Sequence, residues 1–247
     1  EDTRNLLKLM KIHGINLRRR PLLSYHDHNG HEQRPKILSF LNDQKSIAFV
    51  SDAGTPLIAD PGYRLVSEAI LNGYYVSGAP GPSAVLAALM ISGLPTDKFL
   101  FGGFIPTKLG AKKRFLAKYV NIAVTLVFYE SSGRIRQTLA DLCTVCDPQR
   151  SVVVCRELTK KFEDVQRGTL REVAQYFANL EKVKGEIVLL LSPCEALATN
   201  DEQINEILID ALDYMSFKNA ISFVSKRLKV KRKIVYAKAL LIRNTNF

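Results

Sequence analysis

Short apolar runs that alternate with helix-like stretches are the feature that most constrains the fold of this chain. Apolar runs of four to seven residues are typical of strands buried in a sheet. Because helical stretches separate them, we expect an α/β architecture. The series starts again after residue 93, which predicts two sheets. The expected strands cover residues 47–50, 74–77, 99–104, 124–129, 151–155 and 185–191.

Two changes of pattern divide the 247 residues into three parts. We expect an N-terminal α/β domain over residues 1–93 and a second α/β domain over residues 94–195. Residues 200–247 are helical in pattern and basic. Ser216 is placed to cap the first of two short helices there, which indicates a helix-turn-helix-like segment. A plain helical cap on the second domain is the alternative.

The stretch over residues 47–62, IAFVSDAGTPLIADPG, passes from an expected strand through a loop of small residues into an expected helix. Ligands of open α/β sheets bind beyond the carboxyl ends of such strands. Gly54 permits close approach of a ligand, while Asp52, Thr55 and Asp60 offer oxygens for amines or hydroxyls. Asp60 followed by proline predicts a helix N-cap. An ordinary strand-to-helix connection has the same pattern.

A second turn, APGPS at residues 79–83, leads into a helix of small and apolar residues. Ser83 occupies the expected N-cap position. Such a helix packs close to its neighbours and points unpaired N–H groups at a ligand. A well-capped core helix without a ligand fits equally.

Positive charge is concentrated in two places. Lysine and arginine outnumber the acids 35 to 24, and no acid follows Asp213. Residues 98–129 form a second region without acids. Clustered basic residues indicate a polyanionic partner, for which nucleic acid is the usual identity. A solvated basic face is the alternative.

Cysteine and histidine placement does not predict a metal site. Cys143 and Cys146 form a CxxC pair, but no second pair follows at zinc spacing. His26 and His28 flank an aspartate in an expected loop, which we interpret as a turn or a substrate-contact surface. No apolar run approaches the length of a membrane span, and no signal peptide is visible. We therefore expect reduced thiols in a cytoplasmic protein.

Six motifs, in order, resemble those of the family of ribosomal RNA small subunit methyltransferase I, within the tetrapyrrole methylase superfamily. Together they extend over most of the chain, and the first is specific to this branch. Small-molecule tetrapyrrole methylases share the architecture but lack this combination of motifs and the basic tail. The motifs are SDAGTPLIADPGYRLV at 51–66, PGPSAVLAAL at 80–89, SGLPTDKFLFGGFIP at 92–106, FYES at 128–131, RELTKKFE at 156–163 and KGEIVLLL at 184–191.

The resemblance implies an enzyme that uses S-adenosylmethionine to methylate the ribose 2′-oxygen of a cytidine in the decoding region of 16S rRNA. It also implies a homodimer of two-domain α/β subunits that acts on the small ribosomal subunit, with the cofactor in the cleft between the domains. The implied cofactor contacts lie in three loops and at strand ends of the second domain. They are Asp52, Ala53, Gly54, Thr55, Pro56, Leu57, Ile58, Ser83, Ala84, Tyr129, Leu158 and Gly185.

The chemistry of ribose methylation suggests a base and a cation near these contacts. A ribose hydroxyl is a poor nucleophile, so its proton must leave or its oxyanion must be stabilised. The candidate bases are Glu130, Glu157 and Glu163, and the candidate cations are Arg156 and Lys160. Structural ion pairing is the alternative for each of them.

The chain departs from the family pattern in two places. The family has a further strand and a Pro-x-Gly-Asn-Leu loop ahead of EDTR at residues 1–4, and we expect that strand inside the first sheet. FYES is followed by Ser132-Gly133-Arg134 instead of Pro-His-Arg, so only Arg134 carries over.

Two rival functions are a methylase of a tetrapyrrole or other small molecule, and a non-catalytic RNA-binding protein of ribosome assembly.

Overall fold

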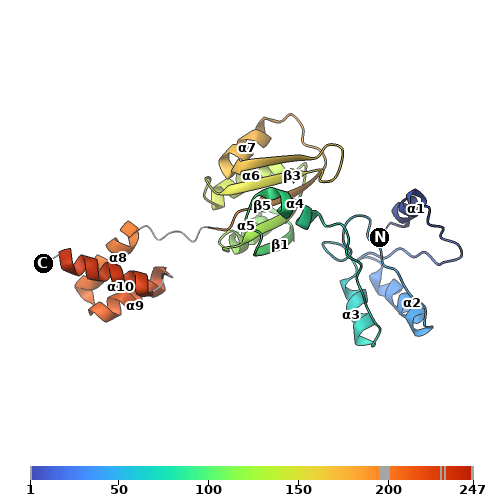
Figure 1. Ribbon diagram of the computed structural model, residues 1–247, viewed down its shortest axis with the longest axis horizontal. Helices are drawn as coiled ribbons and strands as arrows, with labels where there is room; N and C mark the ends of the chain where they lie inside the picture. Colours follow the sequence, from blue (N-terminus) through green and yellow to red (C-terminus); the bar gives the residue numbers. More distant parts are fainter. Residues whose placement is uncertain (1, 195–200, 229, 231, 246–247) are drawn as a thin grey trace. The chain divides into compact units, whose positions relative to one another are not determined.

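The computed structural model describes residues 2–194, 201–228, 230 and 232–245 (Figure 1). The chain forms two compact units. The first comprises Glu1–Lys118 with Thr125–Ser192, and the second comprises Tyr119–Val124 with Pro193–Phe247. Residues 1–93 and most of residues 94–195 belong to the first unit, and the division at residue 93 stays a prediction.

A five-stranded mixed sheet forms the centre of the first unit. Its strand order is β1-β2-β5-β3-β4, with β1 parallel to β2 and the other pairs antiparallel. Strands were predicted at four of these positions, and β4 was not, because its alternation of polar and small residues lacks an apolar run. The strands are β1 (Phe99–Phe104), β2 (Thr125–Ser131), β3 (Ser151–Arg156), β4 (Asp164–Thr169) and β5 (Glu186–Leu191).

Helices cover both faces of this sheet. On one face, α4 (Ala84–Ser92) packs Val85, Ala88 and Leu89 against the inward side chains of β2, β3 and β5. On the other face lie α5 (Leu109–Tyr119) and α6 (Ile135–Val145). Phe115 of α5 contacts the buried ring of Phe128, with ring centroids 5.5 Å apart. Neighbouring residues of β2 therefore pack against helices on opposite faces of the sheet, because successive side chains of a strand point to opposite faces.

A capping box begins α7 (Leu170–Asn179), and the sequence TLRE at residues 169–172 has the spacing that predicts it. The Thr169 hydroxyl accepts a hydrogen bond from the Glu172 N–H, and the Glu172 carboxylate accepts one from the Thr169 N–H. This reciprocal pairing satisfies two N–H groups that a helix start leaves without partners. The helix then buries Leu170, Val173 and Phe177.

The N-terminal part of the first unit is helical, with α1 (Thr3–Ile12), α2 (Gly30–Asn42) and α3 (Tyr63–Leu71). The strands predicted at residues 47–50 and 74–77 are not formed, so the prediction of a first sheet is wrong for the described residues. The physical reason is that a buried parallel strand needs paired neighbours. Neither segment pairs with a strand here, and the side chain of Tyr75 is 92% exposed.

The predicted N-cap of α3 is also wrong. Gly62 is the capping residue, at φ 130°, where Asp60 was expected. A Cβ at residue 62 would meet the ring of Phe49 at 2.9 Å, so the chain passes too close for any other residue. The sequence Asn72-Gly73, which is typical of a helix end, ends α3 here, since Asn72 caps it and Gly73 follows at φ 78°.

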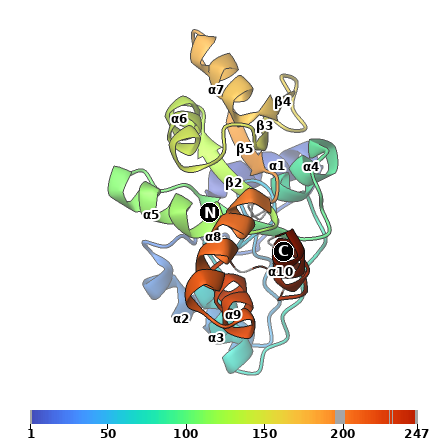
Figure 2. The same cartoon turned by 90° about the vertical axis from the view of Figure 1, so that its left-hand side faces the viewer.

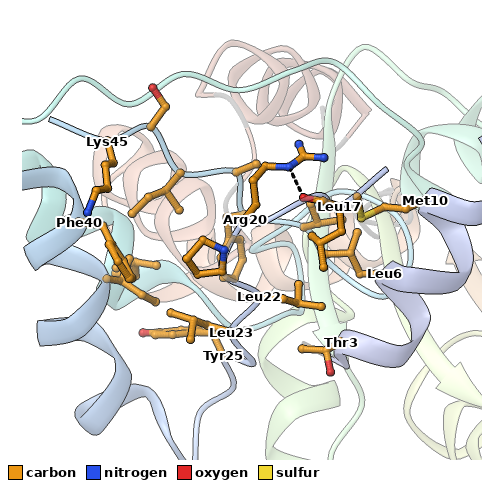
Figure 3. Close-up of a pocket in the computed structure, with 18 of the residues that line it drawn as sticks. Thr3, Leu6, Met10, Leu17, Arg20, Leu22, Leu23, Tyr25, Phe40 and Lys45 are labelled. Atoms are coloured by element: carbon orange, nitrogen blue, oxygen red, sulfur yellow. Dashed lines mark hydrogen bonds between the residues drawn. The ribbon is translucent and has the colours of Figure 1, made fainter. Parts of the chain in front are cut away.

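A cavity of about 590 Å³ lies beside the extended segment at residues 46–50 (Figure 3). Its wall is mostly apolar, with Leu6 and Met10 from α1 and Phe40 from α2. Arg20 closes one side and donates a hydrogen bond to the carbonyl oxygen of Leu17. Residues 47–50, which were predicted to form a buried strand of a first sheet, thus line this cavity instead.

The second unit is a three-helix assembly of α8 (Asp201–Tyr214), α9 (Phe217–Leu228) and α10 (Arg232–Thr245) (Figure 2). Apolar side chains from all three helices form its core, including Leu208, Val224 and Val235. Ser225 fixes the turn between α9 and α10 by donating its hydroxyl to the carbonyl oxygen of Val230 at 2.7 Å. Within the part of the chain that the structure describes, no helix is long and apolar enough to cross a bilayer.

Candidate active site

The loop after residue 50 is tightly wound, although the strand expected before it is absent. Gly54, Leu57 and Ala59 all have positive φ, at 72°, 70° and 63°. This region is unfavourable for residues with a side chain, and such strain is frequent at functional sites. The Ser51 hydroxyl donates to the carbonyl oxygens of Ala53 and Gly54, at 3.3 and 3.0 Å. These bonds close the first part of the loop, over residues 51–54.

A hydrogen bond joins this turn to the turn that begins α4. The Thr55 hydroxyl donates to the carbonyl oxygen of Pro82 at 2.8 Å. Ser83 is the N-cap of α4, as predicted, and its hydroxyl accepts from the Leu86 N–H at 3.4 Å. The first N–H groups of α4 therefore lie next to the residue 51–58 loop.

Three of the expected cofactor contacts meet on the α4 face of the sheet. Ala84, Tyr129 and Leu158 come from α4, β2 and the segment after β3, and all pack against one buried cluster that includes Val127 and Val188. Burial raises the pKa of Tyr129, and the carboxylates of Asp60 and Glu186 add to the rise. The structure thus brings together residues that are widely separated in the sequence.

Gly185 lies at the same edge of the sheet, in close contact with the side chain of Glu157. A Cβ at residue 185 would lie 2.4 Å from Cγ of Glu157, and Gly185 has φ 96°. The Glu157 carboxylate accepts the Glu186 N–H at 2.9 Å, and the Glu157 N–H donates to the Glu186 carbonyl at the same distance. Gly185 therefore makes room for the turn that carries Leu158.

The candidate base Glu157 and the candidate cation Lys160 are bonded to each other. Lys160 Nζ lies 3.0 Å from Glu157 Oε1 and 2.8 Å from Glu186 Oε2. The backbone N–H of Glu186 and the ammonium of Lys160 lower the pKa of Glu157. The two carboxylates in turn raise the pKa of Lys160. Glu157 is therefore a weak proton acceptor, while Lys160 remains cationic and partly exposed.

Glu163 and Arg156 complete this group. Glu163 accepts a hydrogen bond from the Thr159 N–H at 2.6 Å, in a turn where Glu157 and Thr159 have φ values of 52° and 64°. Arg156 Nε lies 3.7 Å from Asp164 Oδ2. The segment after β3 thus gathers the predicted acids and cations beside Leu158.

Glu130 lies on the opposite face of the sheet from Tyr129. Its side chain is buried, accepts a hydrogen bond from the Thr138 hydroxyl at 2.7 Å, and lies 3.3 Å from the Arg134 guanidinium. Neighbouring residues of a strand point to opposite faces, so Glu130 faces α6 while Tyr129 faces α4. The structure does not bring Glu130 together with the other candidates.

An aromatic group around Tyr129 was missed by the sequence reasoning. The rings of Phe101 and Phe104 lie 4.8 and 5.3 Å from that of Tyr129. The available signal was the glycine pair Gly102-Gly103, which is typical of a bulge that redirects a strand. Strand β1 indeed shifts register between Phe101 and Phe104.

Neither metal nor disulfide chemistry is indicated by the described residues. They contain no group of three histidine, cysteine or acidic side chains placed to hold a metal ion. Cys143 and Cys155 are free thiols. Burial raises the pKa of Cys155 to about 11, so its thiol is protonated and unreactive.

Known proteins resemble this chain in sequence and in fold. A family model described as Tetrapyrrole (Corrin/Porphyrin) Methylases matches residues 9–174. A ribosomal RNA small subunit methyltransferase I from Mesorhizobium japonicum is 41% identical over 246 residues, which is 100% of this chain and 83% of that protein. A protein of the same name from Vibrio cholerae is 38% identical and covers 96% of this chain and 82% of its own length.

Solved structures share the fold at low identity. The structure of diphthine synthase has a TM-score of 0.57 at 12% identity, over 78% of this chain and 74% of that one. That of the methyltransferase CobJ has a TM-score of 0.54 at 18% identity, over 78% and 86%. These likenesses extend to the architecture alone.

Proposed function

Because the chain belongs to the family of ribosomal RNA small subunit methyltransferase I, within the tetrapyrrole methylases, we propose that it transfers a methyl group from S-adenosylmethionine to a ribose 2′-oxygen of ribosomal RNA. The target that we propose is a cytidine in the decoding region of 16S rRNA. The observation that carries the proposal is the convergence of Ala84, Tyr129 and Leu158 on one cluster. The loop at residues 51–58 joins them through the bond from Thr55 to Pro82.

The residues at this edge suit an adenosyl group. Tyr129 and Leu158 offer an aromatic and an aliphatic surface to a flat ring, and the absence of a Cβ at Gly54 permits close approach. The first N–H groups of α4 and the hydroxyl of Thr55 provide polar contacts for ribose oxygens or a carboxylate. The carboxylate of Asp60, which acts on the pKa of Tyr129, provides negative charge near a cationic ligand.

Alignment of the acceptor is the main task of the protein in this reaction. S-adenosylmethionine supplies an electrophilic methyl group, whose bond to sulfur breaks as the ribose oxygen attacks from the opposite side. Holding the two reactants in line supplies much of the acceleration. We propose Lys160 and Arg156 as the cations that stabilise the developing alkoxide. Glu163, with one carboxylate oxygen bonded to the Thr159 N–H, is the proposed proton acceptor.

The second unit supplies a surface suited to the RNA backbone. No acid follows Asp213 in the sequence, and Lys218, Lys226 and Arg227 on α9 are exposed. Arg227 and Arg243 lie over phenylalanine rings, with 5.7 Å from Cζ to the centroid in each case. Basic groups interleaved with aromatic rings favour contact with phosphates and bases. This surface favours an RNA substrate over a tetrapyrrole.

The decisive experiment is transfer of tritium-labelled methyl groups to purified small ribosomal subunits, followed by nuclease digestion. The proposal predicts label in 2′-O-methylcytidine. Label that appears only in added tetrapyrroles would support the small-molecule alternative. Binding to subunits without transfer of label would support the non-catalytic alternative.

We further propose that the protein acts as a homodimer in the cytoplasm, as the resemblance implies. Sedimentation equilibrium of the purified protein is the test of the dimer. A single species at the monomer mass of 27.7 kDa, at every concentration measured, would contradict it.

A further inference from the structure

The carboxyl end of β1 continues into a surface that the family assignment does not explain. At this point the chain passes from the end of β1 to the helix α5 (Figure 1). The Phe104 ring at the end of β1 is exposed, and α5 is rich in basic residues. We infer that Phe104, Lys108, Lys113 and Arg114 form the docking surface for a single-stranded segment of the RNA substrate, with Phe104 as the base-stacking residue. The inference rests on the proposed function and adds the residues that read the substrate.

The bulge in β1 places the Phe104 ring at the candidate active site. A Cβ at residue 102 would lie 2.4 Å from the Phe128 ring, and Gly103 has φ 69°, so the two glycines make the bulge possible. The ring of Phe104 then lies 5.3 Å from that of Tyr129 and remains 58% exposed. An aromatic ring of this exposure is a platform for an unstacked base.

The connection from Phe104 to α5 is fixed to the active-site strand. The Ile105 N–H donates to the Tyr129 carbonyl at 3.3 Å. The Arg134 guanidinium donates to the carbonyl oxygens of Ile105 and Pro106. Lys108 therefore begins a cationic surface that is held at a constant position relative to Tyr129.

Buried contacts fix the orientation of α5 and leave one face outward. Lys112 is buried and its ammonium lies 2.7 Å from Asp141 Oδ2, while Leu116 is buried beside it. Lys108, Lys113 and Arg114 are exposed, and none of the ion pairs found among the described residues includes them.

Charge complementarity identifies the occupant of this surface. No acidic residue occurs between residues 98 and 129. The carboxylate of Asp141, which also acts on Lys113, is held by Lys112. Lys113 and Arg114 are five and six residues beyond Lys108, which corresponds to a rise of about 7.5–9 Å along the helix axis. Phosphates on these cations and a base on Phe104 require an RNA strand with accessible bases, because a duplex keeps its bases stacked inside.

The stacking role is tested with Phe104→Ala in the full chain. Fluorescence anisotropy with a labelled single-stranded RNA oligonucleotide is the measurement, and a hairpin duplex of the same composition is the comparison. Loss of one stacked base predicts about 5- to 150-fold weaker binding of the single strand. Phe104→Tyr restores binding, and Phe99→Ala, at the other end of the same strand, serves as the matched control.

The charge role is tested with the double variant Lys113→Glu/Arg114→Glu. Loss of two phosphate contacts lowers the slope of log affinity against log salt by about 1.4 for a single strand. Lys8→Glu/Lys11→Glu on α1 makes the same change in net charge elsewhere and leaves the slope unchanged. Calorimetric binding of S-adenosylmethionine reports that each variant is folded.

The outcomes separate this inference from the proposed function. Single-strand binding by Phe104→Ala within twofold of the Phe99→Ala control overturns the stacking role. An equal loss for single strand and duplex also overturns it, since a duplex offers no free base. A parent protein that binds the single strand through these residues but methylates no RNA supports the docking surface and refutes the proposed function.

Discussion

Substitution of Gly185 by alanine tests whether the strand ends of the sheet are arranged as described. The added Cβ would lie 2.4 Å from Cγ and 2.7 Å from Cδ of Glu157, and the residue has φ 96°. A side chain in the left-handed region costs about 1–2 kcal/mol. Forcing a methyl group into a packed position costs about 1–3 kcal/mol more. We therefore expect Gly185→Ala to lower the free energy of unfolding by about 2–5 kcal/mol.

The effect on the site follows from the same clash. Glu157 must move, and Leu158 moves with it, so affinity for S-adenosylmethionine falls. A destabilisation of this size lowers Tm by about 4–20 °C for a unit of roughly this length. Circular dichroism melting and calorimetric titration are the two assays. Gly133→Ala is the matched control, because a Cβ there meets nothing within 4 Å.

A Gly185→Ala protein that melts within about 1 °C of the Gly133→Ala control, with the cofactor affinity of the parent, would refute the reasoning. It would mean that Glu157 does not occupy the space beside Gly185, so the turn carrying Leu158 is placed differently.

Three further substitutions test individual contacts of the candidate active site. Thr55→Val removes the bond to the Pro82 carbonyl, and we expect about 2- to 12-fold weaker binding of S-adenosylmethionine by calorimetry, with Tm nearly unchanged. Ser83→Ala removes the cap of α4 and lowers the free energy of unfolding by about 1 kcal/mol in urea titrations; no change in the midpoint would contradict the cap. Lys160→Ala lowers turnover on ribosomal subunits far more than cofactor affinity, and equal turnover would remove it from the mechanism. The pKa of Glu157 is lower in the folded protein than in the unfolded chain. Ionised Glu157 therefore stabilises the folded protein above its unfolded pKa, and this stabilisation is lost as pH falls through its folded pKa. The acid-side decrease in Tm is therefore smaller in Lys160→Ala.

The central sheet was predictable because most of its strands are marked by a run of apolar residues within the strand itself. Residues 152–155 and 187–191 are continuous apolar runs, and their burial on both faces agrees with that composition. The capping box at Thr169 and the cap at Ser83 were predictable for the same reason, since each depends on residues within one turn of helix. Local signals of this kind need no knowledge of the tertiary structure.

Other features depend on partners that a local pattern does not reveal. Residues 47–50 read as a strand, but pairing between strands decides whether a strand forms. Glu130 was a reasonable candidate base by its position after Tyr129, yet the alternation along β2 turns it toward Thr138. Likewise, the pairing of Lys160 with Glu186 joins residues 26 positions apart, which no motif contains.

Calorimetric titration of the protein with S-adenosylmethionine, in the presence and absence of small ribosomal subunits, tests the central claim most directly. The account predicts saturable binding that weakens in Thr55→Val and Gly185→Ala and persists in Gly133→Ala. Absence of binding under both conditions, or binding that none of these substitutions alters, would contradict it.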